Sequence, residues 1–168
     1  MQGAGNGTYW AANLQASTGA DNWGGWALIV VYANNSLPLR NLVIYDGFAL
    51  VDGTGANGVQ IPLSGFLTPY SGTVTTRVGT VGYDGDRGTG IYSGDTLQVS
   101  SSTNPSLTTV FDANNPSDNF YNSTISDLGT MFTARNPAFN NTYGFELDRF
   151  NLATGIVGNG ATSATLSL

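Results

Sequence analysis

The sequence predicts a single all-β domain, an antiparallel β-sandwich or jelly roll. Three observations lead to this fold class. The chain has 168 residues, which is the length of about one domain. Its 23 glycines and many asparagines interrupt it at short intervals, and the runs between them are rich in Val, Ile, Thr, Tyr and Phe. We therefore expect one domain over residues 1–168, with a flexible N-terminal segment at 1–7.

The runs between the turn signals define the expected strands. The clearest is Trp26–Ala33, which is apolar at both alternating positions. Because side chains alternate between the two faces of a strand, both faces must be covered, and we predict a central strand here. Asn34–Pro38 then turns the chain into a second apolar run. The other expected strands lie at 8–16, 40–51, 59–62, 72–83, 96–101, 107–112, 130–135, 143–152 and 161–168.

One segment departs from the strand pattern. Tyr121, Ile125 and Leu128 recur at helical spacing, and Gly129 follows as a stop signal. We therefore expect one short helix near 118–128.

The composition excludes several classes of function. The chain has no Cys and no His, and all five of its basic residues are Arg. Zinc, haem and iron–sulfur sites, His-dependent nucleophilic catalysis and Lys-dependent phosphate loops are therefore ruled out. A net charge of −6 argues against nucleic-acid binding. No apolar run reaches the roughly 18 residues of a membrane span, so we expect none in this chain.

Two acids two residues apart raise the question of catalysis. Glu146 and Asp148 share one face of an expected strand, and glycosidases act through a pair of carboxylates. Such a pair is more often a solvated strand face, balanced here by Arg149 or Arg135. We therefore predict that the protein is not an enzyme and keep a carboxylate hydrolase as a minor alternative.

The acidic loop DGDRGTG suggests a metal ion. Asp84, Asp86 and Asp95 occupy positions 1, 3 and 12 of an EF-hand-like loop, although flanking helices and the usual glycine and glutamate are missing. Three carboxylates in one glycine-rich loop suit a calcium ion, and calcium is the one cofactor we expect. The alternative is a solvated acidic turn that Arg87 partly neutralises.

Three aromatic residues are candidates for ligand binding. Trp23 and Trp26 are separated by two glycines, and Tyr9 lies nearby in the sequence. Exposed indole and phenol rings of this kind stack on sugars, whereas buried ones fill a core. Core or strand-edge packing is the more common role of such residues, and Tyr9, Trp23 and Trp26 are the candidates for ligand binding.

Nearly the whole chain resembles a β-rich module of large secreted and surface-anchored bacterial proteins, adhesin-like and often found beside DUF11-type repeats. The order of its motifs carries the resemblance. These are GTYWAANLQA, ADNWGGWALIVVY, PLRNLVIYDGF, GYDGDRG, ARNP, YGFELD and NGATSATLSL.

The resemblance implies an extracellular or cell-surface location and neighbouring domains as partners. It implies no catalytic residues. Taking the resemblance together with the acidic loop, we expect a non-catalytic structural or adhesive module that calcium in this loop stabilises. The alternative is a carbohydrate-binding module that uses the aromatic residues and the acidic loop. The expected strand at 161–168 would be an edge strand able to pair with another chain.

Overall fold

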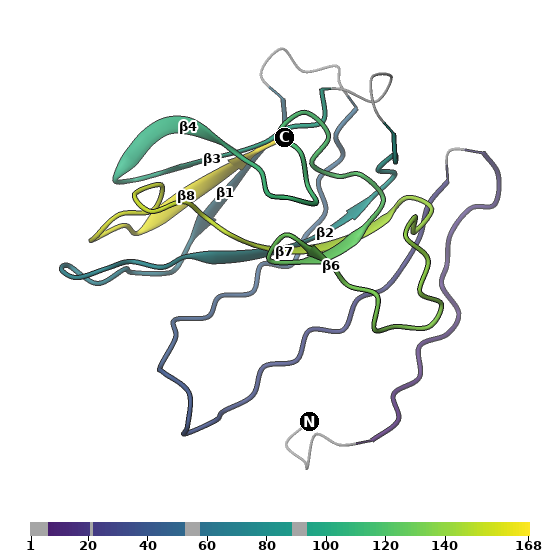
Figure 1. Ribbon diagram of the computed structural model, residues 1–168, viewed down its shortest axis with the longest axis horizontal. Helices are drawn as coiled ribbons and strands as arrows, with labels where there is room; N and C mark the ends of the chain where they lie inside the picture. Colours follow the sequence, from purple (N-terminus) through teal and green to yellow (C-terminus); the bar gives the residue numbers. More distant parts are fainter. Residues whose placement is uncertain (1–6, 21, 53–57, 89–93) are drawn as a thin grey trace.

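The computed structural model describes residues 7–20, 22–52, 58–88 and 94–168, and it confirms the all-β fold class (Figure 1). Sheet A has the order β1-β8-β3-β4, and sheet B has the order β2-β7-β5-β6. Neighbouring strands are antiparallel except β5 and β7, which are parallel. The strands of sheet A are β1 (Gln60–Ser64), β3 (Leu97–Ser101), β4 (Asn104–Val110) and β8 (Ser163–Ser167). Those of sheet B are β2 (Arg77–Tyr83), β5 (Ile125–Asp127), β6 (Thr130–Met131) and β7 (Phe145–Asn151).

The apolar core lies between the two sheets. Sheet A contributes alternate residues of its central strands, such as Leu97 and Val99 of β3. Sheet B contributes Phe150 of β7, whose ring packs edge to face on Phe120 at 5.1 Å between centroids. The buried members of this core are Leu97, Val99, Val110, Phe120, Phe150, Leu152, Ile156, Val157, Ala161 and Leu166.

The helix expected near 118–128 is wrong. The described residues contain no helix, and residues 125–131 form a small hairpin of β5 and β6 instead. Leu128 and Gly129 have φ values of 53° and 78°. Two successive residues with positive φ make the tight turn that matches the twist of a hairpin. The glycine that reads as a helix stop is therefore a hairpin turn residue.

The three expected N-terminal strands are also wrong. Residues 7–20 and 22–52, which we call the N-terminal segment, form no strand and run as extended chain outside sheet B (Figure 1). Trp26 and Ile29 are 59% and 61% exposed, so 26–33 is not a central strand. The turn after it is confirmed, because the Leu37 amide donates to the Asn34 carbonyl at 3.0 Å. An apolar pattern predicts burial, but a strand also needs a hydrogen-bonded neighbour, and neither sheet supplies one here.

This exposure changes what substitutions should do to stability. Trp26→Ala and Ile29→Ala should each lower the free energy of unfolding by less than about 1 kcal/mol, because neither side chain leaves a buried cavity behind. Urea denaturation followed by circular dichroism measures both. A loss of about 2 kcal/mol or more at either position would show that residues 26–33 are packed in solution.

The C-terminal strand is not an edge. β8 lies between β1 and β3, and both of its sides are hydrogen-bonded. The expectation that it is an edge strand, open to pairing with another chain, is therefore wrong. The described residues contain no helix of the length and apolarity that crossing a bilayer takes. Of the N-terminal stretch expected to be flexible, residues 1–6 lie outside the described residues.

Candidate functional site

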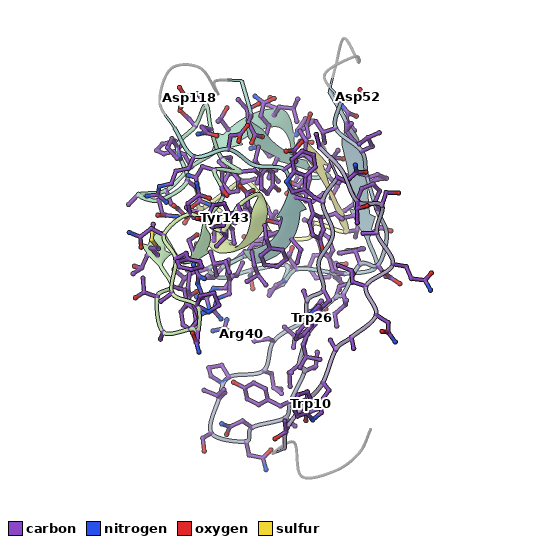
Figure 2. All side chains as sticks on the ribbon, turned by 90° about the vertical axis from the view of Figure 1, so that its right-hand side faces the viewer. Trp10, Trp26, Arg40, Asp52, Asp118 and Tyr143 are labelled. Carbon is purple, nitrogen blue, oxygen red and sulfur yellow. The ribbon has the colours of Figure 1, made fainter. Side chains whose placement is uncertain are left out.

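Two loops and Trp23 surround a polar hollow of about 250 Å³. The first loop follows β2 and carries the predicted residues Asp84 and Asp86. The second precedes β7 and carries Tyr143, which is labelled in Figure 2. The residues that line the hollow are Trp23, Asp84, Gly85, Asp86, Arg87, Ser123, Asn141, Tyr143 and Gly144. The fold thus brings together three predicted site residues from two distant parts of the chain.

Hydrogen bonds join the two loops. The Asp84 amide donates to the Gly144 carbonyl at 2.7 Å, and Arg87 Nη1 donates to the Asn140 carbonyl at 2.8 Å. The Gly144 amide donates to Ser123 Oγ at 2.7 Å. These contacts hold the two loops in place on either side of the hollow.

Gly144 is required where it stands. Its φ is +86°, a conformation that side chains disfavour. A Cβ at this position would also lie 2.6 Å from Trp23 Nε1. The absence of a side chain therefore lets the indole lie against the loop.

Asp95 is not among the residues that line the hollow. It forms an isolated bridge with Asn119, whose Nδ2 donates to the carbonyls of Asp86 and Gly88 at 3.1 and 3.3 Å. Burial raises the pKa of Asp95 to about 6. The structure therefore does not bring Asp95 into the hollow with Asp84 and Asp86. Among the described residues, no three carboxylates are arranged to hold a metal ion, and calcium in this loop stays a prediction.

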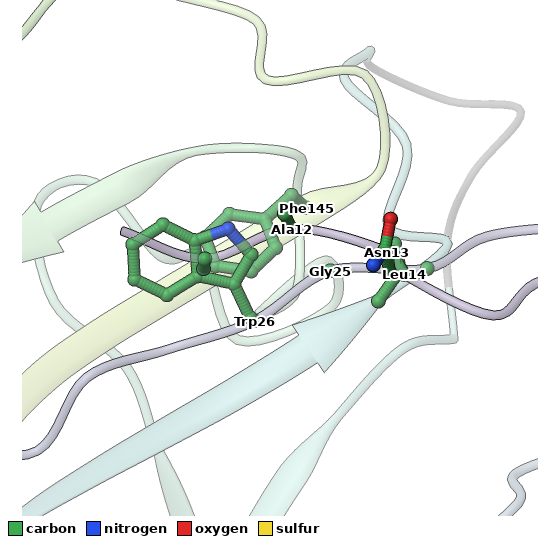
Figure 3. Close-up of a pocket in the computed structure, with 8 residues that line it drawn as sticks. Ala12, Asn13, Leu14, Gly25, Trp26 and Phe145 are labelled. Carbon is green, nitrogen blue, oxygen red and sulfur yellow. The ribbon is translucent and has the colours of Figure 1, made fainter. Parts of the chain in front are cut away.

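Trp26 belongs to a different hollow, of about 530 Å³, between the N-terminal segment and β7 (Figure 3). Its indole lies near the ring of Phe145, which Figure 3 shows beside it. Gly25 fits closely there, because a Cβ would lie 2.8 Å from Cε1 of Tyr83. Tyr9, which is exposed, is among the lining residues of neither hollow. The structure therefore separates the three predicted aromatic residues.

Glu146 and Asp148 point into the sandwich. They are 0% and 1% exposed, so the solvated strand face expected for them is wrong. Along β7 they share the inward side with Phe150, while Leu147 and Arg149 face outward. Arg149 pairs with Asp127 on that outer side, with Nε 2.6 Å from Oδ1. Arg149, one of the two arginines expected to balance the acids, is thus on the opposite face of the sheet.

Glu146 lies directly behind the hollow. Its Oε1 accepts a hydrogen bond from the Ser123 amide and occupies the space where a side chain of Gly85 would stand. Burial, with a smaller contribution from the nearby Asp148, Asp95 and Asp86 carboxylates, raises the pKa of Glu146 to about 9, although the hydrogen bond from the Ser123 amide opposes the rise. At neutral pH the Glu146 side chain is therefore protonated and uncharged.

Asp148 lies two residues further along β7, on the same inward side. It stands in register with Thr80 of β2 and Ser126 of β5, so three neighbouring strands present polar side chains in one row. Ser126 Oγ donates to Asp148 Oδ1 at 2.7 Å and lies 3.1 Å from Asn115 Oδ1. Asp112 Oδ1 accepts a hydrogen bond from the backbone N–H of Asn115 at 2.9 Å, so Asp112 belongs to the same group. Burial raises the pKa of Asp148, and the Ser126 hydroxyl and the Asn115 side chain oppose this rise.

We call this group, together with Glu146, the acidic cluster. It consists of Thr80, Asp112, Asn115, Ser126, Glu146 and Asp148. In the described part of the chain, five buried side-chain atoms lack a hydrogen-bond partner, and all five belong to this cluster. They are Thr80 Oγ1, Asp112 Oδ2, Asn115 Nδ2, Glu146 Oε2 and Asp148 Oδ2. Unsatisfied buried polar atoms are rare and normally scattered, so their concentration here calls for an explanation.

Comparison of the chain with protein-family models, with curated proteins and with solved structures gave no match.

Proposed function

We propose that the chain is a non-catalytic adhesive module of a bacterial surface protein, and that it binds a carbohydrate in the hollow at Trp23. The observation that carries the proposal is the convergence of Trp23, Asp86 and Arg87 on one preformed polar hollow. The sequence resemblance to surface-anchored modules supports the extracellular setting.

The lining of the hollow suits a sugar. An indole offers a flat apolar face for the C–H side of a pyranose ring. Asp86 supplies a carboxylate acceptor for sugar hydroxyls, and Arg87 supplies guanidinium donors. A few fixed polar groups beside an aromatic surface are typical of small-molecule sites.

The position of Glu146 supports binding rather than hydrolysis. A raised pKa is typical of a general acid, but such a group must reach the bond that it protonates. The Glu146 side chain is fully buried behind Gly85, so it does not contact what the hollow holds.

Removing the indole should weaken sugar binding. We expect Trp23→Ala to lower affinity by about 10-fold or more for whichever glycan binds best on an array, because the stacking surface is lost. Isothermal titration calorimetry measures the change. Trp10→Ala is the matched control, since Trp10 is 90% exposed and stands away from the sandwich (Figure 2), and its affinity should equal that of the unaltered chain.

Two results would contradict the proposal. One is equal loss of affinity in the Trp10 and Trp23 variants, which would indicate non-specific contacts. The other is an array on which no glycan binds above background. A glycan that is cleaved rather than retained, with cleavage lost in Glu146→Gln, would replace the binding role with hydrolysis.

A role in joining neighbouring domains is the second candidate, and the N-terminal segment favours it. Leu28, Val30 and Tyr32 are all more than half exposed, and so are many apolar residues between 37 and 51. Monomeric proteins rarely expose apolar patches of this extent without a partner. In a longer fragment with adjoining domains, slower amide exchange at residues 26–51 than in this chain alone would support that role; equal exchange would exclude it.

A further inference from the structure

The acidic cluster has no cationic side chain to neutralise it. The chain contains five Arg and neither Lys nor His. Arg149 pairs with Asp127, Arg77 donates to Asn151, Arg87 to Asn140 and Arg135 to carbonyls of residues 132–139. Arg40 is exposed on the N-terminal segment. Every basic side chain is therefore placed elsewhere.

Asp148 is deeply buried, one of its carboxylate oxygens has no hydrogen-bond partner, and the other belongs to a hydrogen-bonded unit with Ser126 and Asn115. Asp148 is 1% exposed and Asn115 is fully buried, and Ser126 Oγ lies within 3.1 Å of an oxygen of each. Asp148 Oδ2 and Asp112 Oδ2 are both buried without a hydrogen bond. A buried carboxylate oxygen with no donor is costly unless a proton or a metal ion satisfies it.

We propose that Asp112 and Asp148, with the hydroxyls of Thr80 and Ser126 and the side-chain oxygen of Asn115, bind a calcium ion inside the sandwich. Carboxylate, hydroxyl and amide oxygens are hard donors, which favours calcium or magnesium over transition metals. The donors come from three strands and a loop at no regular spacing. Calcium tolerates such an arrangement, whereas magnesium demands near-octahedral geometry.

The ion would also serve the fold. Sheet B contributes Thr80, Ser126 and Asp148, while Asp112 and Asn115 lie in the segment between β4 and β5. One ion at this place would therefore fasten that segment to the inner face of sheet B. The site differs from the acidic loop, because Asp84 and Asp86 take no part in it.

Calcium should raise the melting temperature of the metal-free chain at pH 7.5. After dialysis against EDTA, calcium at about 100 times its dissociation constant should raise it by about 5–10 °C. Magnesium chloride and an equal ionic strength of sodium chloride should change it by less than about 2 °C. An equal melting temperature in EDTA and in 10 mM calcium would overturn the proposal.

Matched variants locate the ion. Asp148→Asn keeps the shape and removes the charge, so it should abolish the calcium response and melt higher than the unaltered chain in EDTA. Asp86→Asn, in the acidic loop, should keep the full response. The reverse pattern would place the ion in the loop and overturn the proposal.

If Asp148→Asn does not fold, Asp112→Asn and terbium luminescence decide the question. Tyr121 packs against Phe120 close to the cluster, whereas Trp23 lines the hollow beside the loop. Terbium in the cluster should therefore be sensitised through tyrosine, and the signal should disappear in Asp112→Asn and persist in Trp23→Ala. Sensitisation lost in Trp23→Ala and kept in Asp112→Asn would contradict the proposal.

Discussion

Phe150→Ala should lower the free energy of unfolding by about 3–5 kcal/mol, as removal of a buried aromatic ring does. Phe150 is 1% exposed in the middle of the core and packs edge to face on Phe120. Its removal opens a cavity between the two sheets that the paired strands on either side cannot close. Urea denaturation followed by tryptophan fluorescence and by circular dichroism gives the loss.

Phe48→Ala is the matched control. The side chain is the same, but Phe48 is 83% exposed on the N-terminal segment. Phe48→Ala should lower the free energy of unfolding by less than about 0.5 kcal/mol, the usual range for surface substitutions. Equal losses at the two positions, or a loss below about 1 kcal/mol at Phe150, would contradict the placement of the core.

The metal-free chain should become less stable as pH rises from about 4.5 to about 9. Glu146 has its ordinary pKa of 4.5 in the unfolded chain and a pKa of about 9 in the folded one. Below pH 4.5 both states are protonated, and the group does not oppose folding. Above it the unfolded state loses its proton while the folded state keeps it, so stability falls until the pH passes about 9. Each unit of pKa difference is about 1.4 kcal/mol, so the total loss is several kcal/mol.

Neighbouring acids add to this dependence. Asp95 contributes a smaller loss between pH 3.8 and about 6, and Asp148 changes in the same direction. Tyr121, packed beside them, has a raised pKa and stays neutral throughout. Chemical denaturation in EDTA at pH 5, 7 and 8.5 measures the slope. Glu146→Gln should remove most of it, and stability that rises with pH in the unaltered chain would contradict the prediction.

The strands of the two sheets were largely predictable because their sequences contain both an apolar alternation and nearby turn signals. Residues 96–101 and 143–152 were expected as strands, and β3 and β7 lie within these ranges. The N-terminal segment was not predictable in the same way. Its apolar runs read as strands, but a single sequence does not say which strand, if any, lies beside them.

The candidate site was predictable in its parts and not in its assembly. Asp84, Asp86 and Trp23 stood out by residue type and spacing, yet only the fold brings the tryptophan against the acidic loop. Asp95 was expected beside them because it completes a spacing pattern, but it is not among the residues that line the hollow. The spacing pattern counts residues along the chain. It does not show to which side of the loop each side chain points.

The inward direction of Glu146 and Asp148 had a signal in the sequence. Phe150 follows the two acids at the same two-residue interval, so all three lie on one face of the strand, and Phe150 belongs to the apolar core. Gly82 stands in register with Glu146, and Gly85 lies against its carboxylate. Two glycines of this kind leave room for a buried carboxyl group. The general preference of acids for water outweighed this signal in the prediction.

A carbon-13 titration of the Glu146 carboxyl group tests most directly the central claim that β7 presents its acids to the interior. Glu146 is the only glutamate in the chain, so labelling glutamate at Cδ gives one assignable signal. In EDTA the signal should remain at the chemical shift of a protonated carboxyl group at pH 7 and titrate near pH 9. A titration midpoint near the ordinary value of 4.5 would show a solvated carboxylate and contradict the account.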